Sequence, residues 1–195
     1  MVETLPLFPL NTLLVPEATL PLQIFEQRYL RLIKQCLRSQ QGFGIVPIRD
    51  GGEVGAPAMI YQVGVLAHIS DWNQGSNGLL HIKVVGSRKF RVLSTQVEDD
   101  QLMTAEVEYL PEEDPLDIPD QFSGLQQLLE ELQEHPQVAA LELPLAHTAS
   151  ELGWLLILLL PLTRSEQVDM LAQNDPIERL QHIAELVDRL SSDPE

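Results

Sequence analysis

The sequence contains one cysteine, Cys36, which excludes a framework of intramolecular disulfide bonds. This residue falls on the apolar side of a helical pattern, so we expect its thiol to be buried and unreactive. A catalytic thiol would need a base, such as His68 or His81, and a turn that exposes the sulfur. No glycine turn flanks Cys36. Catalysis by a cysteine is therefore not predicted.

Long apolar runs are also missing. The longest, from Trp154 to Leu160, is much shorter than the roughly 20 residues that cross a membrane. No leader with basic, apolar and small-residue parts opens the sequence. We therefore expect a soluble protein with a cytoplasmic location and no membrane contact.

Positive charge is scarce and unevenly distributed. The sequence has 12 Lys and Arg residues against 29 Asp and Glu, which gives a net charge of −17. The first 97 residues contain nine basic and six acidic residues, whereas the remainder contains three basic and 23 acidic residues. A polyanionic half repels nucleic acid and anionic membranes. Nucleic-acid binding by the whole chain is therefore disfavoured, although the first half alone permits it.

Motifs for nucleotide hydrolysis and metal binding are absent. The phosphate loop GxxxxGK[ST] occurs nowhere in the chain. The only lysines are Lys34, Lys83 and Lys89, and none has the surroundings of a serine–lysine peptidase dyad. The acidic residues form no calcium-binding loop. The sequence thus predicts no cofactor, no metal and no enzyme activity.

Prolines divide the opening stretch, residues 5–37, into short extended pieces. Each proline removes a backbone donor and restricts φ, so one continuous helix is excluded. The prolines are Pro6, Pro9, Pro16 and Pro21. From Glu26 onward the apolar residues recur at helical spacing, and the sequence therefore predicts one amphipathic helix here.

The region up to residue 109 is typical of antiparallel strands, with a glycine-rich loop at 49–58. We expect strands at 42–48, 62–70, 79–86, 88–95 and 102–109. If Asp71 faces Gly78 in the hairpin, His68 and His81 lie opposite each other on the solvent face. Such a pair can hold a divalent metal. Histidines on a wetted sheet face are more often only solvated, and no metal site is predicted.

The last third is helical and follows a proline-rich acidic segment. We expect a helix from Phe122 to about His135, a wholly apolar central helix around 154–160, and a closing helix at 175–190. Three helix starts combine an N-cap residue with Glu three positions later. These pairs are Thr148 with Glu151, Thr163 with Glu166 and Asp175 with Glu178.

Three motifs make the sequence similar to the N-terminal domain family of Lon proteases, in its stand-alone bacterial form. The run LPLFPLNTLLVPEATLPLQIFEQRY, the strand GSRKFRV and the box DPIERL stand in the order of that family. The matching positions include Pro6, Phe8, Pro9, Leu10, Pro21, Leu22, Ile24, Phe25, Glu26, Arg28, Tyr29, Asp175, Pro176, Glu178, Arg179 and Leu180. Glu17 departs from the pattern, in which glycine is usual after the proline. The resemblance covers nearly the whole chain.

The resemblance implies an α+β fold in two parts. Residues 1–112 are expected to form a PUA-like β-barrel with one helix, 113–120 an acidic, proline-rich linker, and 121–195 a C-terminal helical bundle. The resemblance further implies that the chain is a non-catalytic module that binds unfolded or degron-bearing polypeptides, with a protease or chaperone as a further partner. The alternatives are an RNA-binding or anion-binding PUA-like module, or an adaptor in an ATP-dependent proteolysis system.

Candidate contact residues lie in and beside the hairpin. Trp72 either packs down as a lid or stands out as a polypeptide contact. Arg88 and Arg91 flank Phe90, and these three form a second candidate surface, unless the basic residues pair with acids of the other half. The family-motif residues are expected to be structural, with Glu26 and Arg28 forming an ion pair or a helix cap. These motif residues are Pro9, Pro21, Phe25, Glu26, Arg28 and Tyr29.

Overall fold

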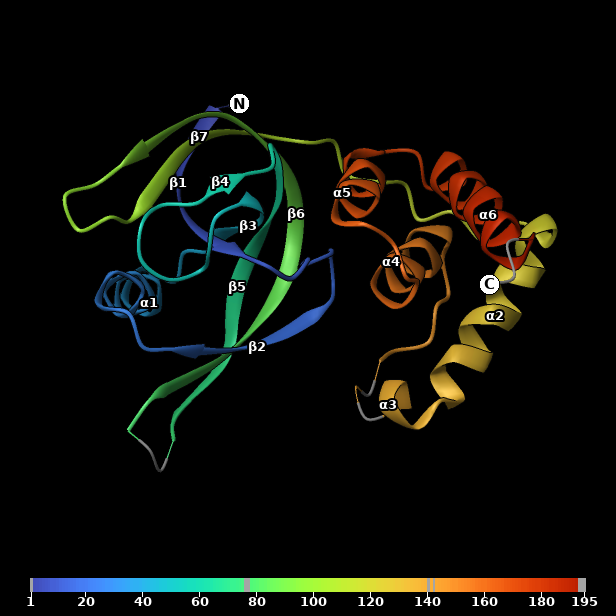
Figure 1. The fold of residues 1–195 in the computed structure, drawn as a ribbon, viewed down its shortest axis with the longest axis horizontal. Helices are drawn as coiled ribbons and strands as arrows, with labels where there is room; N and C mark the ends of the chain where they lie inside the picture. Colours follow the sequence, from blue (N-terminus) through green and yellow to red (C-terminus); the bar gives the residue numbers. More distant parts are fainter. Residues whose placement is uncertain (1, 76–77, 140, 142, 193–195) are drawn as a thin grey trace. The chain divides into compact units, whose positions relative to one another are not determined.

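The computed structural model describes residues 2–75, 78–139, 141 and 143–192 (Figure 1). The chain forms two compact units, Met1–Pro111 (unit 1) and Glu112–Glu195 (unit 2). Unit 1 holds the strands and one helix, and the described residues of unit 2 form helices and one isolated bridge. This is the expected α+β fold. The exact bounds of the domains and of the linker stay a prediction.

Unit 1 is a closed β-barrel. The strands are β1 (Val2–Leu10), β2 (Thr19–Ile24), β3 (Phe43–Asp50), β4 (Met59–Ile60), β5 (Val63–Gln74), β6 (Leu80–Val97) and β7 (Met103–Tyr109). They run in the order β1-β7-β6-β5-β3, and a parallel pairing of β1 with β3 closes the ring. Strand β2 adds to β6, and α1 (Gln27–Ser39) follows β2. Closure leaves fewer exposed sheet edges.

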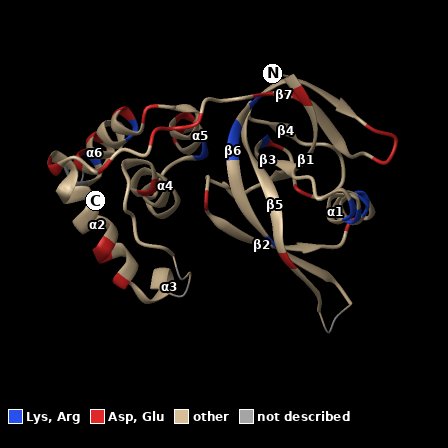
Figure 2. Cartoon of the chain, turned by 180° about the vertical axis from the view of Figure 1, so that it is seen from behind, with Lys and Arg blue, Asp and Glu red and all other residues tan. Residues whose placement is uncertain are grey.

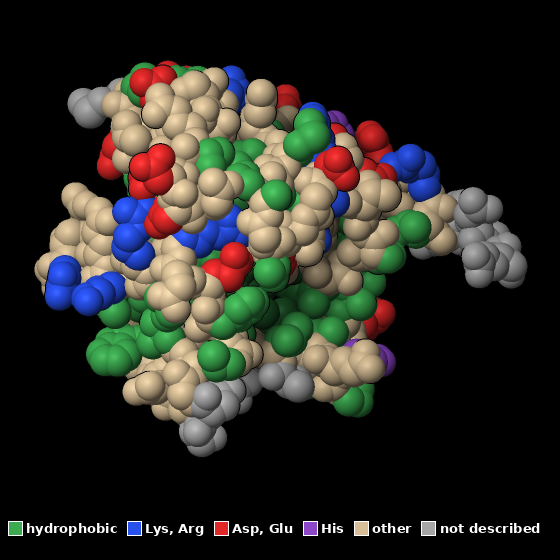
Figure 3. All heavy atoms as spheres, turned by 60° about the vertical axis from the view of Figure 1, so that its left-hand side comes forward, with side chains coloured by type: hydrophobic (Ala, Val, Ile, Leu, Met, Phe, Trp, Pro, Cys, Tyr) green, Lys and Arg blue, Asp and Glu red, His purple; other side chains and the backbone are tan. Residues whose placement is uncertain are grey.

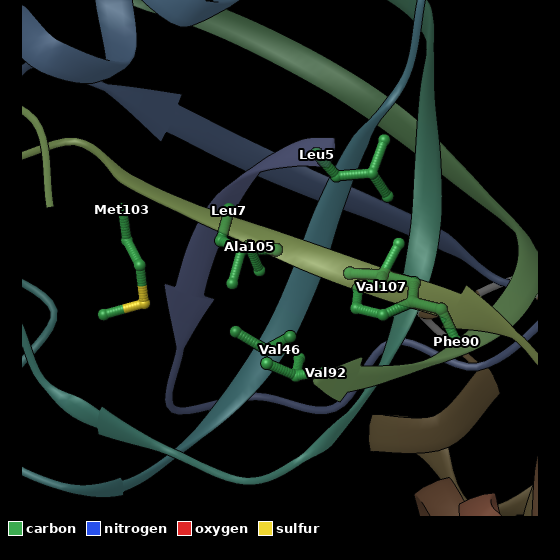
Figure 4. Close-up of a cluster of buried hydrophobic side chains, with 8 residues drawn as sticks. All are labelled: Leu5, Leu7, Val46, Phe90, Val92, Met103, Ala105 and Val107. Atoms are coloured by element: carbon green, nitrogen blue, oxygen red, sulfur yellow. The ribbon is translucent and has the colours of Figure 1, made fainter. Parts of the chain in front are cut away.

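The barrel interior is filled by apolar side chains that alternate along the strands (Figure 4). The cluster consists of Leu5, Leu7, Val46, Phe90, Val92, Met103, Ala105 and Val107. Phe90 has no exposed surface, and a Cβ on Gly44 or Gly64 would lie 2.7 Å from its ring. Phe90 is therefore a core residue, and the prediction that it contacts a polypeptide is wrong.

The hairpin differs from the expected one in length and register. The two strands expected at 79–86 and 88–95 are one continuous strand, β6, and Trp72 lies in β5 rather than in a loop. Asp71 pairs with Lys83, not with Gly78, after an irregularity between Ile69 and Asp71. Such a bulge shifts the register of the two strands. Because β5 and β6 pair over a greater length than expected, more of their backbone N–H and C=O groups form hydrogen bonds to each other and fewer are left to bond to water.

The expected pairing of the two hairpin histidines is consequently wrong. His68 lies opposite Val85, and His81 lies opposite Asn73. Within the part of the chain that the structure describes, no group of three or more His, Cys, Asp or Glu side chains is placed to hold a metal.

Unit 2 is a helical bundle around α4. Its helices are α2 (Ser123–Glu134), α3 (Pro136–Ala139), α4 (Ala149–Leu159), α5 (Arg164–Ala172) and α6 (Pro176–Ser192), with a short 3-10 turn at Asp120–Phe122. Helix α4 contacts α2, α5 and α6, and most of its residues are buried. This is the central helix that the wholly apolar run predicted. None of the described helices is long and apolar enough to cross a membrane.

The three expected helix starts are observed. Thr148 and Thr163 form reciprocal capping boxes with Glu151 and Glu166 at the starts of α4 and α5. At the start of α6, Asp175 Oδ1 accepts hydrogen bonds from the backbone N–H groups of Ile177 (2.8 Å) and Glu178 (3.3 Å). Each cap satisfies amides that have no partner within the helix.

The acidic segment before the first helix of unit 2 is attached to the helices. The backbone N–H of Ala149 donates to the carbonyl of Leu116 (2.8 Å), and Asp117 forms an isolated bridge with Thr148. Glu113 pairs with Arg179 of α6. The segment expected as a linker is therefore ordered against unit 2 over at least part of its length.

Candidate functional site

A pocket of about 250 Å³ opens on unit 1 where β1, β2, the start of α1 and the loop between β3 and β4 meet. Most of its lining is apolar, and an apolar pocket with a few polar groups is the usual form of a binding site. The lining residues are Phe8, Pro9, Leu10, Pro21, Leu22, Gln23, Ile24, Phe25, Glu26, Tyr29, Glu53 and Val54. The opening stretch of the sequence thus supplies nearly the whole pocket.

Two large apolar side chains at this pocket are exposed to water. Phe25 is 54% exposed and Val54 is 61% exposed. Phe25 precedes Glu26, whose backbone is still extended (φ −77°, ψ 139°), so it lies before the helix and off the buried face of α1. Val54 lies in the glycine-rich loop. Exposed apolar side chains beside an apolar pocket form a surface that gains from being covered.

Arg28 connects the start of α1 with the glycine-rich loop and with the turn before β7. Its guanidinium is 3.0 Å from the Glu26 carboxylate, and it donates to the carbonyl oxygens of Gln101 (3.0 Å) and Glu53 (3.4 Å). Arg28 is only 6% exposed. The expected ion pair with Glu26 is therefore confirmed, whereas Glu26 makes no side-chain cap on α1. The hydrogen bond to the carbonyl of Glu53 connects the helix start to the glycine-rich loop.

Tyr29 also lines the pocket and packs against neighbouring aromatic and basic side chains. Its ring meets Phe8 edge to face, with centroids 3.9 Å apart and planes at 87°, and the Arg28 guanidinium carbon lies 4.7 Å from the ring centroid. Burial raises the pKa of Tyr29 to about 12, against a smaller opposing effect of Arg28. The phenol is thus neutral at physiological pH and serves as a packing group.

The only thiol of the chain lies outside this pocket. Cys36 is buried in α1, and burial raises its pKa to about 11. A thiolate is the reactive form of cysteine, so at neutral pH this side chain is a poor nucleophile. Its expected burial is confirmed.

Trp72 is exposed and shares a sheet face with the pocket. It is 54% exposed and lies opposite Ile82 on β6, which in turn lies opposite Leu22 on β2. Directly opposed residues point to the same face of a sheet. Trp72 therefore lies two strands, about 10 Å, from a residue that lines the pocket. Of the two readings of Trp72, the structure favours an exposed contact over a packed lid.

Arg88 and Arg91 lie elsewhere on β6. The Arg88 guanidinium is 4.3 Å from the centroid of the Tyr109 ring, and Arg91 is exposed and pairs in register with Glu108 of β7. Neither lines the pocket. The structure therefore does not bring the four predicted contact residues together. That Arg88 and Arg91 contact a polypeptide remains a prediction, and neither residue lies at this pocket.

Sequence reasoning assigned the pocket residues to structure rather than to binding. Five of the six motif residues, Pro9, Pro21, Phe25, Glu26 and Tyr29, line the pocket, and Arg28 supports it. Val54 was missed altogether. A valine between Glu53 and Gly55 in a glycine-rich loop is the one sequence signal that marks it, since loop residues are normally polar.

Charge differs between the surfaces of the two units. Lys and Arg gather on α1, whereas Asp and Glu recur along α2 (Figure 2). On the face shown in Figure 3, hydrophobic side chains reach the surface beside basic and acidic ones.

The family model of the ATP-dependent protease La (LON) substrate-binding domain matches residues 4–189 of the chain. The chain is similar to the solved structure of a Lon N-terminal domain protein from Xanthomonas campestris, with a TM-score of 0.78 and 31% sequence identity. That match covers 94% of this chain and 98% of the other.

Two Lon proteases illustrate the similarity in sequence. Lon protease 2 of Syntrophobacter fumaroxidans is 34% identical over 113 residues, which is 57% of this chain and 14% of that protein. The Lon protease of Anaeromyxobacter dehalogenans is 27% identical over 192 residues, or 94% of this chain and 21% of that protein. The match therefore spans only a small part of each of these relatives.

Proposed function

Because this chain belongs to the family of the LON substrate-binding domain, we propose that it is a non-catalytic module that captures apolar segments of unfolded or degron-bearing polypeptides at the pocket beside Phe25. The single observation that carries the proposal is the exposure of Phe25 and Val54 at an apolar pocket. Such segments are buried in folded proteins and accessible in unfolded ones, and the pocket would therefore discriminate between the two states.

The expected affinity is modest. Burial of apolar surface contributes roughly 25 cal/mol per Å², but ordering an unfolded chain opposes it. A pocket of about 250 Å³ has room for one or two large side chains only. Weak and reversible capture suits a module that passes its cargo on, and a protease or chaperone is the proposed recipient.

Fluorescence anisotropy with a labelled, permanently unfolded model substrate tests the proposal. We expect the double variant Phe25→Ser, Val54→Ser to lose most of the binding, because it removes the exposed apolar surface of the pocket. Leu93→Ser is the matched control, since Leu93 is 48% exposed on β6 and does not line the pocket. Absence of binding by the folded wild-type chain, or equal loss in the control, would refute the assignment.

Binding of RNA or another polyanion is less well supported. Arg31 on α1 is 2.5 Å from Glu98 and 2.8 Å from Asp100, so part of its positive charge is already compensated. If phosphates were bound, affinity for an RNA oligonucleotide would fall steeply with salt. We expect no RNA binding at low salt.

A further inference from the structure

Unit 2 has a groove of about 430 Å³ between α5 and α6. Each helix contributes one face at a spacing of three and four residues. Helix α5 and its C-cap supply Glu166, Asp169, Met170 and Gln173, and α6 supplies His182, Glu185, Leu186 and Arg189. Two antiparallel or crossing helix faces of this kind are the surroundings in which a third helix packs.

The base of the groove is apolar and its rim is charged. Met170 and Leu186 are 5% and 8% exposed, so they form the floor. Asp169 and Glu185 are exposed on the two opposite rims. Hydrogen bonds from Thr163 lower the pKa of Glu166, which keeps this third carboxylate ionised. Among the described residues that line the groove, Arg189 is the one permanently charged cation, and the groove therefore has a net negative rim.

We propose that the α5–α6 groove is a docking site for an amphipathic helix of a partner protein, with apolar residues three or four positions apart that are flanked by Lys or Arg. The apolar side chains of the partner would cover Met170 and Leu186. Its basic residues would face Asp169 and Glu185. This interaction is separate from the capture of unfolded chains by unit 1, because all the lining residues belong to unit 2.

Charge complementarity is the reason for a basic partner rather than an acidic one. Residues 112–195 contain 18 acidic and three basic residues, and the side chain of one of the three, Arg179, is fully buried against Glu113. An acidic helix would be repelled by this unit, whereas a basic one is attracted before contact. The apolar floor then supplies packing contacts that depend on the shape of the partner helix. Charge attraction alone does not select a shape.

The test uses the full chain and three labelled helical peptides of 16 residues. The first has Leu on one face and Lys on either side of it, the second has Glu in place of Lys, and the third has Ser in place of Leu. We expect only the first to bind. Binding of the third peptide as tightly as the first would show a mere charge effect and would overturn the proposal, as would no binding of the first.

Charge-reversal variants locate the site. The double variant Asp169→Lys, Glu185→Lys is expected to weaken binding of the first peptide about tenfold, because two attractive charges become repulsive. Glu130→Lys, Glu134→Lys is the matched control, with the same change of net charge on exposed positions of α2. Equal weakening in both variants means non-specific attraction and contradicts the assignment.

The variant Phe25→Ser, Val54→Ser separates this inference from the proposed function. We expect this variant to bind the first peptide as the wild type does and to lose most of its binding of the unfolded substrate. If it loses the peptide instead, the peptide occupies the pocket of unit 1 and the groove proposal fails, whatever the fate of the proposed function.

Discussion

Arg179 of α6 donates to both carboxylate oxygens of Glu113, with Nη1 3.0 Å from Oε2, although the arginine side chain has no exposed surface. Its guanidinium carbon also lies 3.5 Å from the centroid of the Trp154 ring, and Nε donates to the carbonyl of Met170 (3.2 Å). Burial lowers the pKa of Arg179, and the pair with Glu113 opposes this effect. The segment before the first helix is thereby tied to the closing helix of unit 2.

Glu113→Ala is expected to destabilise unit 2 by about 3–5 kcal/mol, because it leaves a buried guanidinium without its counter-charge. The free energy of unfolding from urea titration measures the change, followed by tryptophan fluorescence in a Trp72→Phe background so that Trp154 of unit 2 is the reporter. The matched control is Glu112→Ala, an exposed neighbour of the same charge, for which we expect less than about 1 kcal/mol. Similar losses in both variants would show that the buried pair has no special role.

Gly153→Ala is expected to destabilise the protein by about 1 kcal/mol even though alanine favours helices. A Cβ at this position would lie 3.0 Å from Cδ of Arg179, whose hydrogen bonds keep it from moving away. Gly124→Ala is the control, since a Cβ on this residue of α2 meets nothing within 4 Å. It should stabilise by roughly 0.5–1 kcal/mol. Thermal unfolding of both variants would reveal the opposite signs, and a stabilised Gly153→Ala variant would contradict the prediction.

Glu17→Gly is expected to stabilise unit 1 by about 1 kcal/mol. Glu17 has a φ of 65°, in the left-handed region where glycine is free of the Cβ penalty. The positive φ accounts for the glycine that the resemblance implies at this position. Gln41→Gly serves as control, because Gln41 is also exposed but is not among the residues with positive φ. Urea denaturation should show a gain for the first variant and none for the second.

Alkaline pH is expected to destabilise unit 1 between pH 9 and 12. The pKa is raised to about 11 at Cys36 and to about 12 at Tyr29 in the folded state, chiefly by burial. Below the ordinary pKa values of 9.0 for the thiol and 10.0 for the phenol, both groups are neutral in both states and their contribution to stability is complete. As pH rises from these values through the pKa values of the folded state, the contribution is lost, because the groups ionise first in the unfolded chain.

The thiol part of this pH dependence can be isolated. Cys36→Ala should show a shallower loss of unfolding free energy between pH 9 and 11 than the wild type, by up to about 2 kcal/mol. Unfolding curves at a series of pH values provide the measurement. Identical slopes for the two proteins would mean that the thiol is not shielded in the folded state.

Local signals in the sequence were sufficient for the helices of unit 2. Thr148, Thr163 and Asp175 each accept amides at the beginning of a helix, and this depends on residues within one turn. The hairpin was predicted less well. The bulge after Ile69 lies in the pairing of the consecutive strands β5 and β6, and the alternation of residues along either strand does not reveal it. The register that placed His68 opposite His81 therefore had no local signal against it.

The sequence by itself determined the family, the division into a β-rich and a helical part, the helix caps, the burial of Cys36 and the ion pair of Glu26 with Arg28. These follow from short-range patterns and from motifs that are read directly. Only the tertiary structure decided that Phe90 is buried, that Glu113 meets Arg179 and that Phe25 and Val54 frame one pocket. Each of these depends on residues that are far apart in the chain, and their proximity is set by how the barrel closes and how the helices pack.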